Sequence, residues 1–162
     1  MEPKYSIEIR PMTPDDLDEV LRIEAVSFPT PWSRALFERE LATPFARSYA
    51  ARETVGGKIF GYACFWFVDS EAHLLNLASH PEYRNGGVGS LLLQQVIDSS
   101  RKEGVQLITL EVRRSNYRAI SLYRNFHFRP RGIRRRYYTD TGEDAVIMGL
   151  TLGEAASSLS TV

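Results

Sequence analysis

The stretch PEYRNGGVGSLLLQQV, residues 81–96, places Gly86, Gly87 and Gly89 directly before a run that is typical of a helix. Glycine loses more backbone entropy than other residues when it is fixed, so such a cluster needs a reason. One reason is a tight turn between a strand and a helix. The other is chemical, because backbone N–H groups without neighbouring Cβ atoms can approach an anion closely at a helix N-terminus. The loop alone leaves both explanations open.

Two nucleotide-binding motifs do not fit this loop. A P-loop needs a lysine and then Ser or Thr after its last glycine, whereas Ser90 and Leu91 follow Gly89. A dinucleotide fingerprint that begins at Gly87 needs a small third residue, where the chain has Leu92. What remains is an arginine followed by glycines that expose successive amides at the start of a helix, a context that suits a pyrophosphate.

The chain on both sides of the loop alternates between strand and helix patterns. Apolar alternation and β-rich runs predict strands near residues 5–10, 47–53, 58–68, 72–78, 105–112, 127–138 and 144–150. Start signals and apolar stripes predict helices from Thr13 to Glu24, after Ser33, from about Val88 to Glu103, and after Ser115. The order with its β-α-β crossover predicts an α/β fold, a mixed sheet with helices on both faces.

Composition limits the possible partners. The length predicts a single domain over residues 1–150 with a loose polar tail over 151–162. Twenty Lys and Arg balance twenty Asp and Glu, so we expect no nucleic acid and no membrane as partner. The longest apolar stretch is too short for a membrane span, and no signal peptide is visible, which predicts a cytoplasmic protein. The lone Cys64 fits a reducing compartment.

Two residues stand out as candidates for chemistry. Glu111 lies mid-strand on one face with Thr109 and Arg113, where a carboxylate must either line a cleft, be paired or face solvent. Tyr123 lies on a helix face that would bury an aromatic side chain in any case, and by itself it favours core packing. The histidines lie in separate elements without metal-ligand spacing, so we predict no metal. The arginine-rich run at 129–136 is typical of a solvated strand face.

The motif R-x-x-G-x-G at Arg84, Gly87 and Gly89, after the strand HLLNLASHPEYR, resembles the GCN5-related N-acetyltransferase (GNAT) superfamily. The resemblance covers about residues 5–150. The segments LEVRRSNYRAISLY, IRRRYY, EDAVIM and SFPTPWS are similar to its RimI branch, which acetylates the N-terminal alanine of a small-subunit ribosomal protein. The resemblance implies the GNAT fold, a mixed and mostly antiparallel central sheet, with acetyl-CoA as co-substrate and a protein or peptide N-terminus as acceptor.

The resemblance also implies roles for individual residues. Glu111 would be the general base, and Tyr123 the acid that protonates the departing thiolate and a coenzyme contact. Phe28, Pro31 and Trp32 on one side and Tyr137 and Tyr138 on the other would border the peptide groove. The coenzyme would contact the backbone of the strand before the loop, the loop itself and one asparagine, which are Leu77, Ala78, Ser79, Arg84, Asn85, Gly86, Gly87, Val88, Gly89, Ser90 and Asn116.

Other functions stay open at this point. A non-catalytic acyl-CoA sensor would keep the glycine loop and lose the base and the acid, and the presence of Glu111, Tyr123, Tyr137 and Tyr138 argues against it. An acetyltransferase acting on lysine side chains or small amines is a rival within the same class. A groove bordered by tyrosines suits a peptide terminus better than either alternative acceptor.

The loop generates a prediction about coenzyme binding. Replacing Gly89 with valine adds a β-branched side chain where the amides are expected to approach the pyrophosphate, and it also disturbs the start of the helix. We expect weaker binding of acetyl-CoA by calorimetry while circular dichroism shows a folded domain. Unchanged affinity in a folded Gly89→Val protein would mean that the loop is only a turn.

Overall fold

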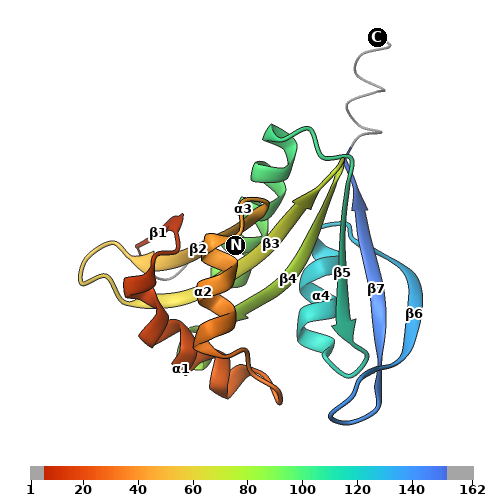
Figure 1. Ribbon diagram of the computed structural model, residues 1–162, viewed down its shortest axis with the longest axis horizontal. Helices are drawn as coiled ribbons and strands as arrows, with labels where there is room; N and C mark the ends of the chain where they lie inside the picture. The colour runs from red at the N-terminus through yellow and green to blue at the C-terminus, as the bar shows by residue number, and fades with distance from the viewer. Residues whose placement is uncertain (1–5, 153–162) are drawn as a thin grey trace. The chain divides into compact units, whose positions relative to one another are not determined.

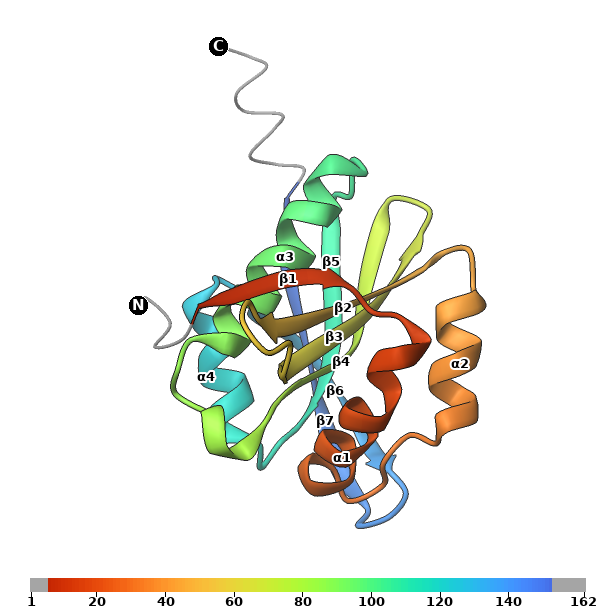
Figure 2. The same cartoon turned by 90° about the vertical axis from the view of Figure 1, so that its left-hand side faces the viewer.

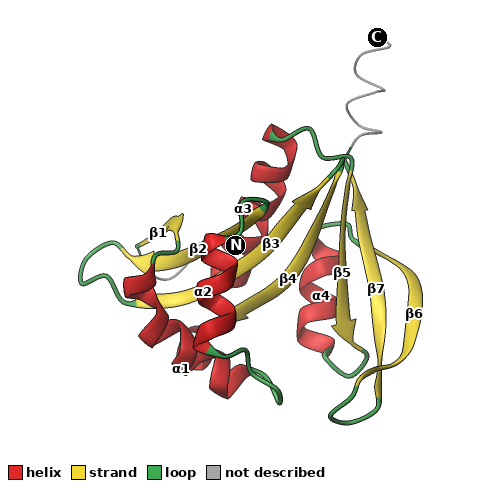
Figure 3. Cartoon of the chain, viewed as in Figure 1, coloured by secondary structure: helices red, strands yellow, loops and turns green. Residues whose placement is uncertain are grey.

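A computed structural model describes residues 6–152 of the chain. Its elements follow the predicted order of strand, two helices, three strands, helix, strand, helix and two strands (Figures 1 and 3). The chain forms two compact units, here called the first and the second unit. The first unit takes the chain up to Trp66 and Leu75–Val96, and the second takes Phe67–Leu74 and the chain from Ile97 onward. None of the described helices is long and apolar enough to cross a membrane.

The first unit combines three antiparallel strands with two neighbouring helices (Figure 2). Ser33 caps the second helix as predicted, because its hydroxyl accepts a hydrogen bond from the Leu36 N–H at 3.2 Å. The elements are β1 (Ile7–Pro11), the 3-10 turn η1 (Pro14–Asp16), α1 (Leu17–Ser27), α2 (Arg34–Ala42), β2 (Ala46–Glu53), most of β3 (Ile59–Val68), the end of β4 (Glu71–Ser79), the 3-10 turn η2 (Pro81–Tyr83) and the start of α3 (Val88–Lys102).

Helices cover both faces of β3 in the first unit. Tyr62 is fully buried in a cluster that includes Leu17 of α1. Its neighbour Gly61 faces α3, because a Cβ at this position would lie 2.9 Å from Val88 and 3.0 Å from Leu92. Successive residues of a strand point to opposite faces, so α1 and α3 lie on opposite sides of β3. This confirms the predicted arrangement of helices on both faces.

The second unit contains the start of β4, the end of α3, β5 (Leu107–Arg113), α4 (Tyr117–Asn125), β6 (Arg129–Tyr138) and β7 (Glu143–Thr151). Buried and partly exposed residues alternate along β5, with Ile108, Leu110 and Val112 buried. The side chains of β6 are almost all exposed, as expected for the last strand of a sheet.

The seven strands follow the order β1-β2-β3-β4-β5-β7-β6. Among the described pairs with a defined register, β4 and β5 alone run parallel, with Glu71 opposite Leu107 and Leu74 opposite Leu110. A parallel pair needs a crossover connection, and α3 supplies it. The sheet is therefore mixed and mostly antiparallel, as the resemblance implied.

The structure corrects two local predictions. Asn116 rather than Ser115 caps α4, since its side-chain oxygen accepts the Ala119 N–H at 3.2 Å, while the Ser115 N–H donates to Glu143 at 2.7 Å. The predicted tail begins later than residue 151, because Thr151 ends β7 and the buried Leu152 donates its N–H to the Gln106 carbonyl. Residues 153–162 of that tail lie outside the described residues.

Candidate active site

A polar face of β5 in the second unit carries the predicted base. Thr109, Glu111 and Arg113 alternate with the buried apolar residues of the strand. Glu111 is paired rather than solvated: its Oε1 lies 2.9 Å from Nε2 of His73 on β4, and only 11% of its side chain is exposed. Its other oxygen, Oε2, lies 3.9 Å from Nε of Arg134 on β6. The carboxylate therefore has a basic or hydrogen-bonding neighbour on each side.

The environment of Glu111 favours its charged form. The hydrogen bond from His73 lowers the pKa of the Glu111 carboxyl below its ordinary value, and the charge of Arg134 and a hydrogen bond from the Tyr137 hydroxyl act in the same direction. Partial burial opposes these effects without cancelling them. Glu111 is therefore a carboxylate at neutral pH, which is the form that a general base needs.

Tyr123 on α4 is buried, with its ring 5.7 Å from that of Phe128. Burial raises the pKa of the Tyr123 hydroxyl well above its ordinary value, and the proximity of Tyr138 adds to the effect. The hydroxyl is therefore protonated at neutral pH. It is available as a hydrogen-bond donor but is a weak acid.

A bulge in β6 directs Tyr137 and Tyr138. Register with β7 is lost between Arg134 and Tyr138, and Arg136 adopts a left-handed conformation with φ of 51°. Asp144 of β7 stabilises the bulge by accepting the Arg136 N–H at 2.9 Å. The two tyrosine rings pack edge to face at 5.1 Å, and Tyr137 keeps 46% of its surface exposed. The exposed ring of Tyr137 is thereby presented next to Glu111.

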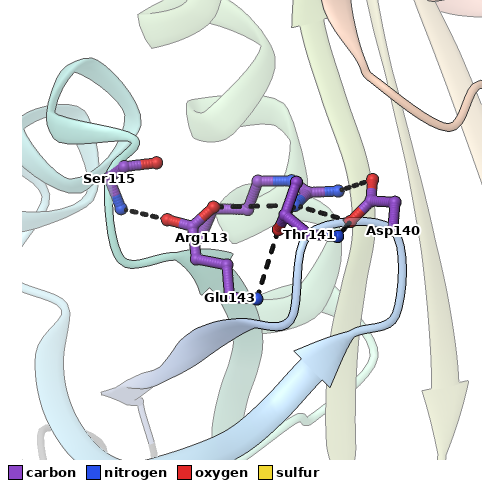
Figure 4. Close-up of polar contacts among 5 residues, drawn as sticks. All are labelled: Arg113, Ser115, Asp140, Thr141 and Glu143. Carbon is purple, nitrogen blue, oxygen red and sulfur yellow. Dashed lines mark hydrogen bonds and ion pairs between the residues drawn. The ribbon is translucent and has the colours of Figure 1, made fainter.

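A set of polar contacts around Arg113, here called the Arg113 clasp, holds the turn between β6 and β7 (Figure 4). The Arg113 guanidinium binds both carboxylate oxygens of Asp140, at 3.1 and 2.7 Å, and lies 3.6 Å from Glu143. Glu143 in turn accepts the Ser115 N–H. The guanidinium also lies 4.0 Å from the ring centre of Tyr138, a cation–π contact. The clasp thus ties the tyrosine-bearing hairpin to the end of β5.

The glycine loop lies in the first unit and has the backbone of a tight turn. Asn85 and Gly87 adopt left-handed conformations, with φ of 66° and 88°. The helix begins at Val88, and the Leu91 N–H donates to the Gly87 carbonyl at 3.0 Å. Gly86 uses its N–H for a long 3.4 Å bond to the Tyr83 carbonyl, within the turn. The first N–H groups of a helix have no partner within the helix, so those of Val88, Gly89 and Ser90 suit an anion.

Strand β4 ends directly before this loop. Ala78 is buried, and Leu77 and Ser79 are partly exposed. The Ala78 carbonyl packs closely on Gly61, where a Cβ would lie 2.6 Å from the oxygen. Glycine at position 61 therefore permits the close approach of β3 to the part of β4 whose backbone is expected to contact the coenzyme.

The segment that contains Phe28, Pro31 and Trp32 is anchored to a buried glutamate in the first unit. Glu24 is 1% exposed and accepts three hydrogen bonds: from the Tyr62 hydroxyl at 2.7 Å, the Asn76 amide at 2.8 Å and the backbone N–H of Trp32 at 2.9 Å. Phe28 and Trp32 pack on the core of this unit, and Pro31 is exposed. Glu24 therefore connects α1, β3 and β4 to the predicted peptide-binding segment.

The predicted site residues fall into two sets. The second unit brings Glu111 together with Tyr137 and contains Tyr123, Tyr138 and Asn116. The first unit contains the glycine loop, the end of β4 and the segment from Phe28 to Trp32. Asn116 is exposed, and its side-chain oxygen accepts the hydrogen bond of the helix cap. Within residues 6–152, no cluster of His, Cys, Asp or Glu is arranged to hold a metal ion.

Sequence reasoning missed two residues of these sets. His73 was considered only as a metal ligand, and Glu24 only as a helix residue. His73 lies on the same face as Glu111 because β4 and β5 pair in parallel with His73 opposite Thr109. The two polar side chains within the otherwise apolar run AHLLNLA, His73 and Asn76, were the available signal.

The chain is similar to proteins of known family. Residues 17–128 match the Acetyltransferase (GNAT) family. Ribosomal protein bS18-alanine N-acetyltransferase of Escherichia coli (strain K12) is 38% identical over 139 residues, 85% of this chain and 92% of that protein. A Bacillus subtilis (strain 168) protein to which the same activity is provisionally ascribed is 38% identical over 152 residues, 93% of this chain and 99% of its own length. The crystal structure of the E. coli enzyme has a TM-score of 0.80 at 37% identity, covering 90% of this chain and 93% of that chain.

The three hydrogen bonds accepted by Glu24 predict how its loss would affect stability. Glu24→Ala leaves three donors without their acceptor and releases Trp32, whereas Tyr62→Phe removes one donor and leaves the bond to Trp32 intact. We expect Glu24→Ala to lower the free energy of unfolding by about 2–4 kcal/mol, and Tyr62→Phe by about 1–2 kcal/mol, in urea titrations.

The same pair of variants separates positioning from stability. We expect Glu24→Ala to raise KM for an acceptor peptide several-fold and Tyr62→Phe to leave it near the wild-type value. Assays run well below the melting temperature of both variants keep the comparison valid. Equal peptide KM in the two variants would show that the bond to Trp32 does not position the segment.

Proposed function

This chain belongs to the GNAT family of acetyltransferases, and on that premise we propose that it transfers an acetyl group from acetyl-CoA to the N-terminal α-amino group of a protein. The acceptor that we propose is the N-terminal alanine of ribosomal protein bS18, the substrate in the name of the E. coli relative. We further propose that residues 1–150 act as one catalytic domain and that the protein works in the cytoplasm, where a lone buried thiol such as Cys64 stays reduced.

One observation carries the catalytic part of this proposal: Glu111 is held as a carboxylate by partners on two other strands, His73 on β4 and Arg134 and Tyr137 on β6. A protein α-amino group has a pKa near 8, so it is mostly protonated at neutral pH and cannot attack a thioester. Glu111 would accept that proton, directly or through a water molecule. A protein that only senses acyl-CoA has no use for such a base.

The freed amine attacks the acetyl carbonyl, and the C–S bond breaks to release the coenzyme as a thiolate. The thiolate has a pKa near 8.5 and is a tolerable leaving group without help. Tyr123 would donate a hydrogen bond to the departing sulfur, and its raised pKa makes complete proton transfer secondary to positioning of the two substrates. No covalent enzyme intermediate is needed, in accord with the buried Cys64, whose pKa is raised to about 12 by burial.

The proposed roles of the other residues follow from their chemistry. The N–H groups of Val88, Gly89 and Ser90 at the start of α3 would bind the pyrophosphate, and the left-handed Gly87 supports this role because it lets the chain turn just before them. The exposed Arg84 would add charge. The backbone of Leu77–Ser79 would pair with the pantetheine arm as an added strand. The exposed ring of Tyr137 and the segment from Phe28 to Trp32 would contact the acceptor peptide.

The base assignment predicts a specific kinetic effect. Glu111→Gln keeps the size of the side chain and removes the proton acceptor, so we expect kcat to fall by about 100-fold or more, with acetyl-CoA affinity within twofold of wild type. The exposed Glu103 of the same unit is a matched control, and Glu103→Gln should leave kcat unchanged. Activity of Glu111→Gln within about twofold of wild type at every pH would refute the assignment.

Acceptor choice is tested by a panel of peptides that differ only at the first residue, read by mass spectrometry. We expect alanine to be acetylated fastest, serine to be tolerated, and methionine and leucine to react poorly, because Pro29 and Pro31 stiffen the segment that borders the first side chain. A peptide blocked at its N-terminus and carrying a lysine should react poorly. If the blocked lysine peptide is the best substrate, the N-terminal acceptor is wrong and the acetyltransferase assignment remains.

A further inference from the structure

Both ring nitrogens of His73 have partners on β5. Nε2 lies 2.9 Å from Oε1 of Glu111, and Nδ1 lies 3.0 Å from the hydroxyl oxygen of Thr109. The parallel register places His73 opposite Thr109, which brings the imidazole level with two polar side chains of one strand face. About a third of the His73 side chain is exposed, 32%, so protons can reach it from water. The three side chains form a continuous hydrogen-bonded chain.

The chemistry of the partners determines where the hydrogens lie. An ionised carboxylate only accepts hydrogen bonds, so Nε2 of His73 carries a proton and donates it to Glu111. A threonine hydroxyl both donates and accepts. It donates to Nδ1 when the imidazole is neutral, and it rotates to accept from Nδ1–H when the imidazole is protonated. Both protonation states of His73 therefore keep both hydrogen bonds, and a proton can be added without breaking the chain.

The two states act differently on Glu111. A neutral imidazole orients the carboxylate and leaves its negative charge free to attract a proton. An imidazolium forms an ion pair with it, and proton transfer from a substrate ammonium then works against that pair. Arg134 and Tyr137 on β6 contact Glu111, and Tyr138 on the same strand interacts with it electrostatically. The exposed Glu71 lies two residues before His73 on its own strand.

We propose that His73 positions the Glu111 carboxylate and controls its ability to accept the substrate proton, with the neutral imidazole, oriented by Thr109, as the active state. The proposal rests on the proposed role of Glu111 as the base. His73 acts here through Glu111 and is a positioning residue. A purely structural His73, joining β4 to β5, would affect stability without changing how the rate depends on pH.

Three variants separate these roles, each assayed for kcat at saturating acetyl-CoA and peptide from about pH 5.5 to 9.5. His73→Gln keeps an N–H donor for Glu111 and cannot titrate. His73→Leu removes the donor. Thr109→Val removes the hydroxyl that orients the imidazole. His127→Asn is the matched control, because it removes an exposed histidine of the same unit at a left-handed position, φ 71°, that asparagine tolerates.

We expect kcat of the wild type to fall toward the acid end of this range. In His73→Gln, kcat should no longer decrease at acid pH, and at pH 8 it should stay within about tenfold of the wild-type value. His73→Leu should lower kcat by about tenfold or more at every pH, with little change in acetyl-CoA KM. Thr109→Val should change the pH at which kcat decreases. His127→Asn should leave the dependence of kcat on pH unchanged.

The outcomes distinguish this inference from the proposed function. If His73→Gln keeps the wild-type acid limb, the control by His73 is wrong, while loss of activity in Glu111→Gln would still support Glu111 as the base. If Glu111→Gln is fully active, the base assignment fails and the inference fails with it. Thermal melting of each variant checks that it is folded. Higher activity of His73→Gln than of His73→Leu would show that the N–H donor to Glu111 matters rather than the bulk of the side chain.

Discussion

The parallel pairing of β4 with β5 is the constraint on which the rest of the candidate site depends. Its register sets His73 opposite Thr109 and brings the imidazole to Glu111. A parallel pair also requires a crossover, which here is α3, and the chain must leave β4 through a tight turn to begin that helix. The glycine loop and the strand that carries Glu111 thus belong to one β-α-β segment of the chain, with the loop before α3 and the strand after it.

Two glutamates, Glu24 and Glu111, lie in different environments. Glu24 is fully buried and is satisfied by neutral donors alone, a phenol, an amide and a backbone N–H. Its three hydrogen bonds hold elements of the first unit together. Glu111 is partly exposed, and its neighbours include His73 and Arg134. These neighbours favour the charged form of Glu111, which the proposed base requires.

The β6–β7 hairpin depends on polar contacts more than on a core. The side chains of β6 are almost all exposed, so burial contributes little to holding this strand. The strand is held instead by the ion pair between Arg113 and Asp140, by the hydrogen bond from the Arg136 N–H to Asp144, and by the cation–π contact of Arg113 with Tyr138. These charge-assisted contacts are directional, so they fix the position of the hairpin that carries Tyr137 and Tyr138.

Local patterns in the sequence were sufficient for the order of the elements, the cap at Ser33 and the start of α3 at Val88, because apolar periodicity and capping residues act over a few neighbouring positions. The choice between Ser115 and Asn116 as a cap was not local, since both the hydroxyl and the backbone N–H of Ser115 bind Glu143 of a distant strand. The resemblance indicated Glu111 but not His73, 38 residues away in the chain. Only the strand register, which depends on long-range hydrogen bonding and packing, decided that these two side chains meet.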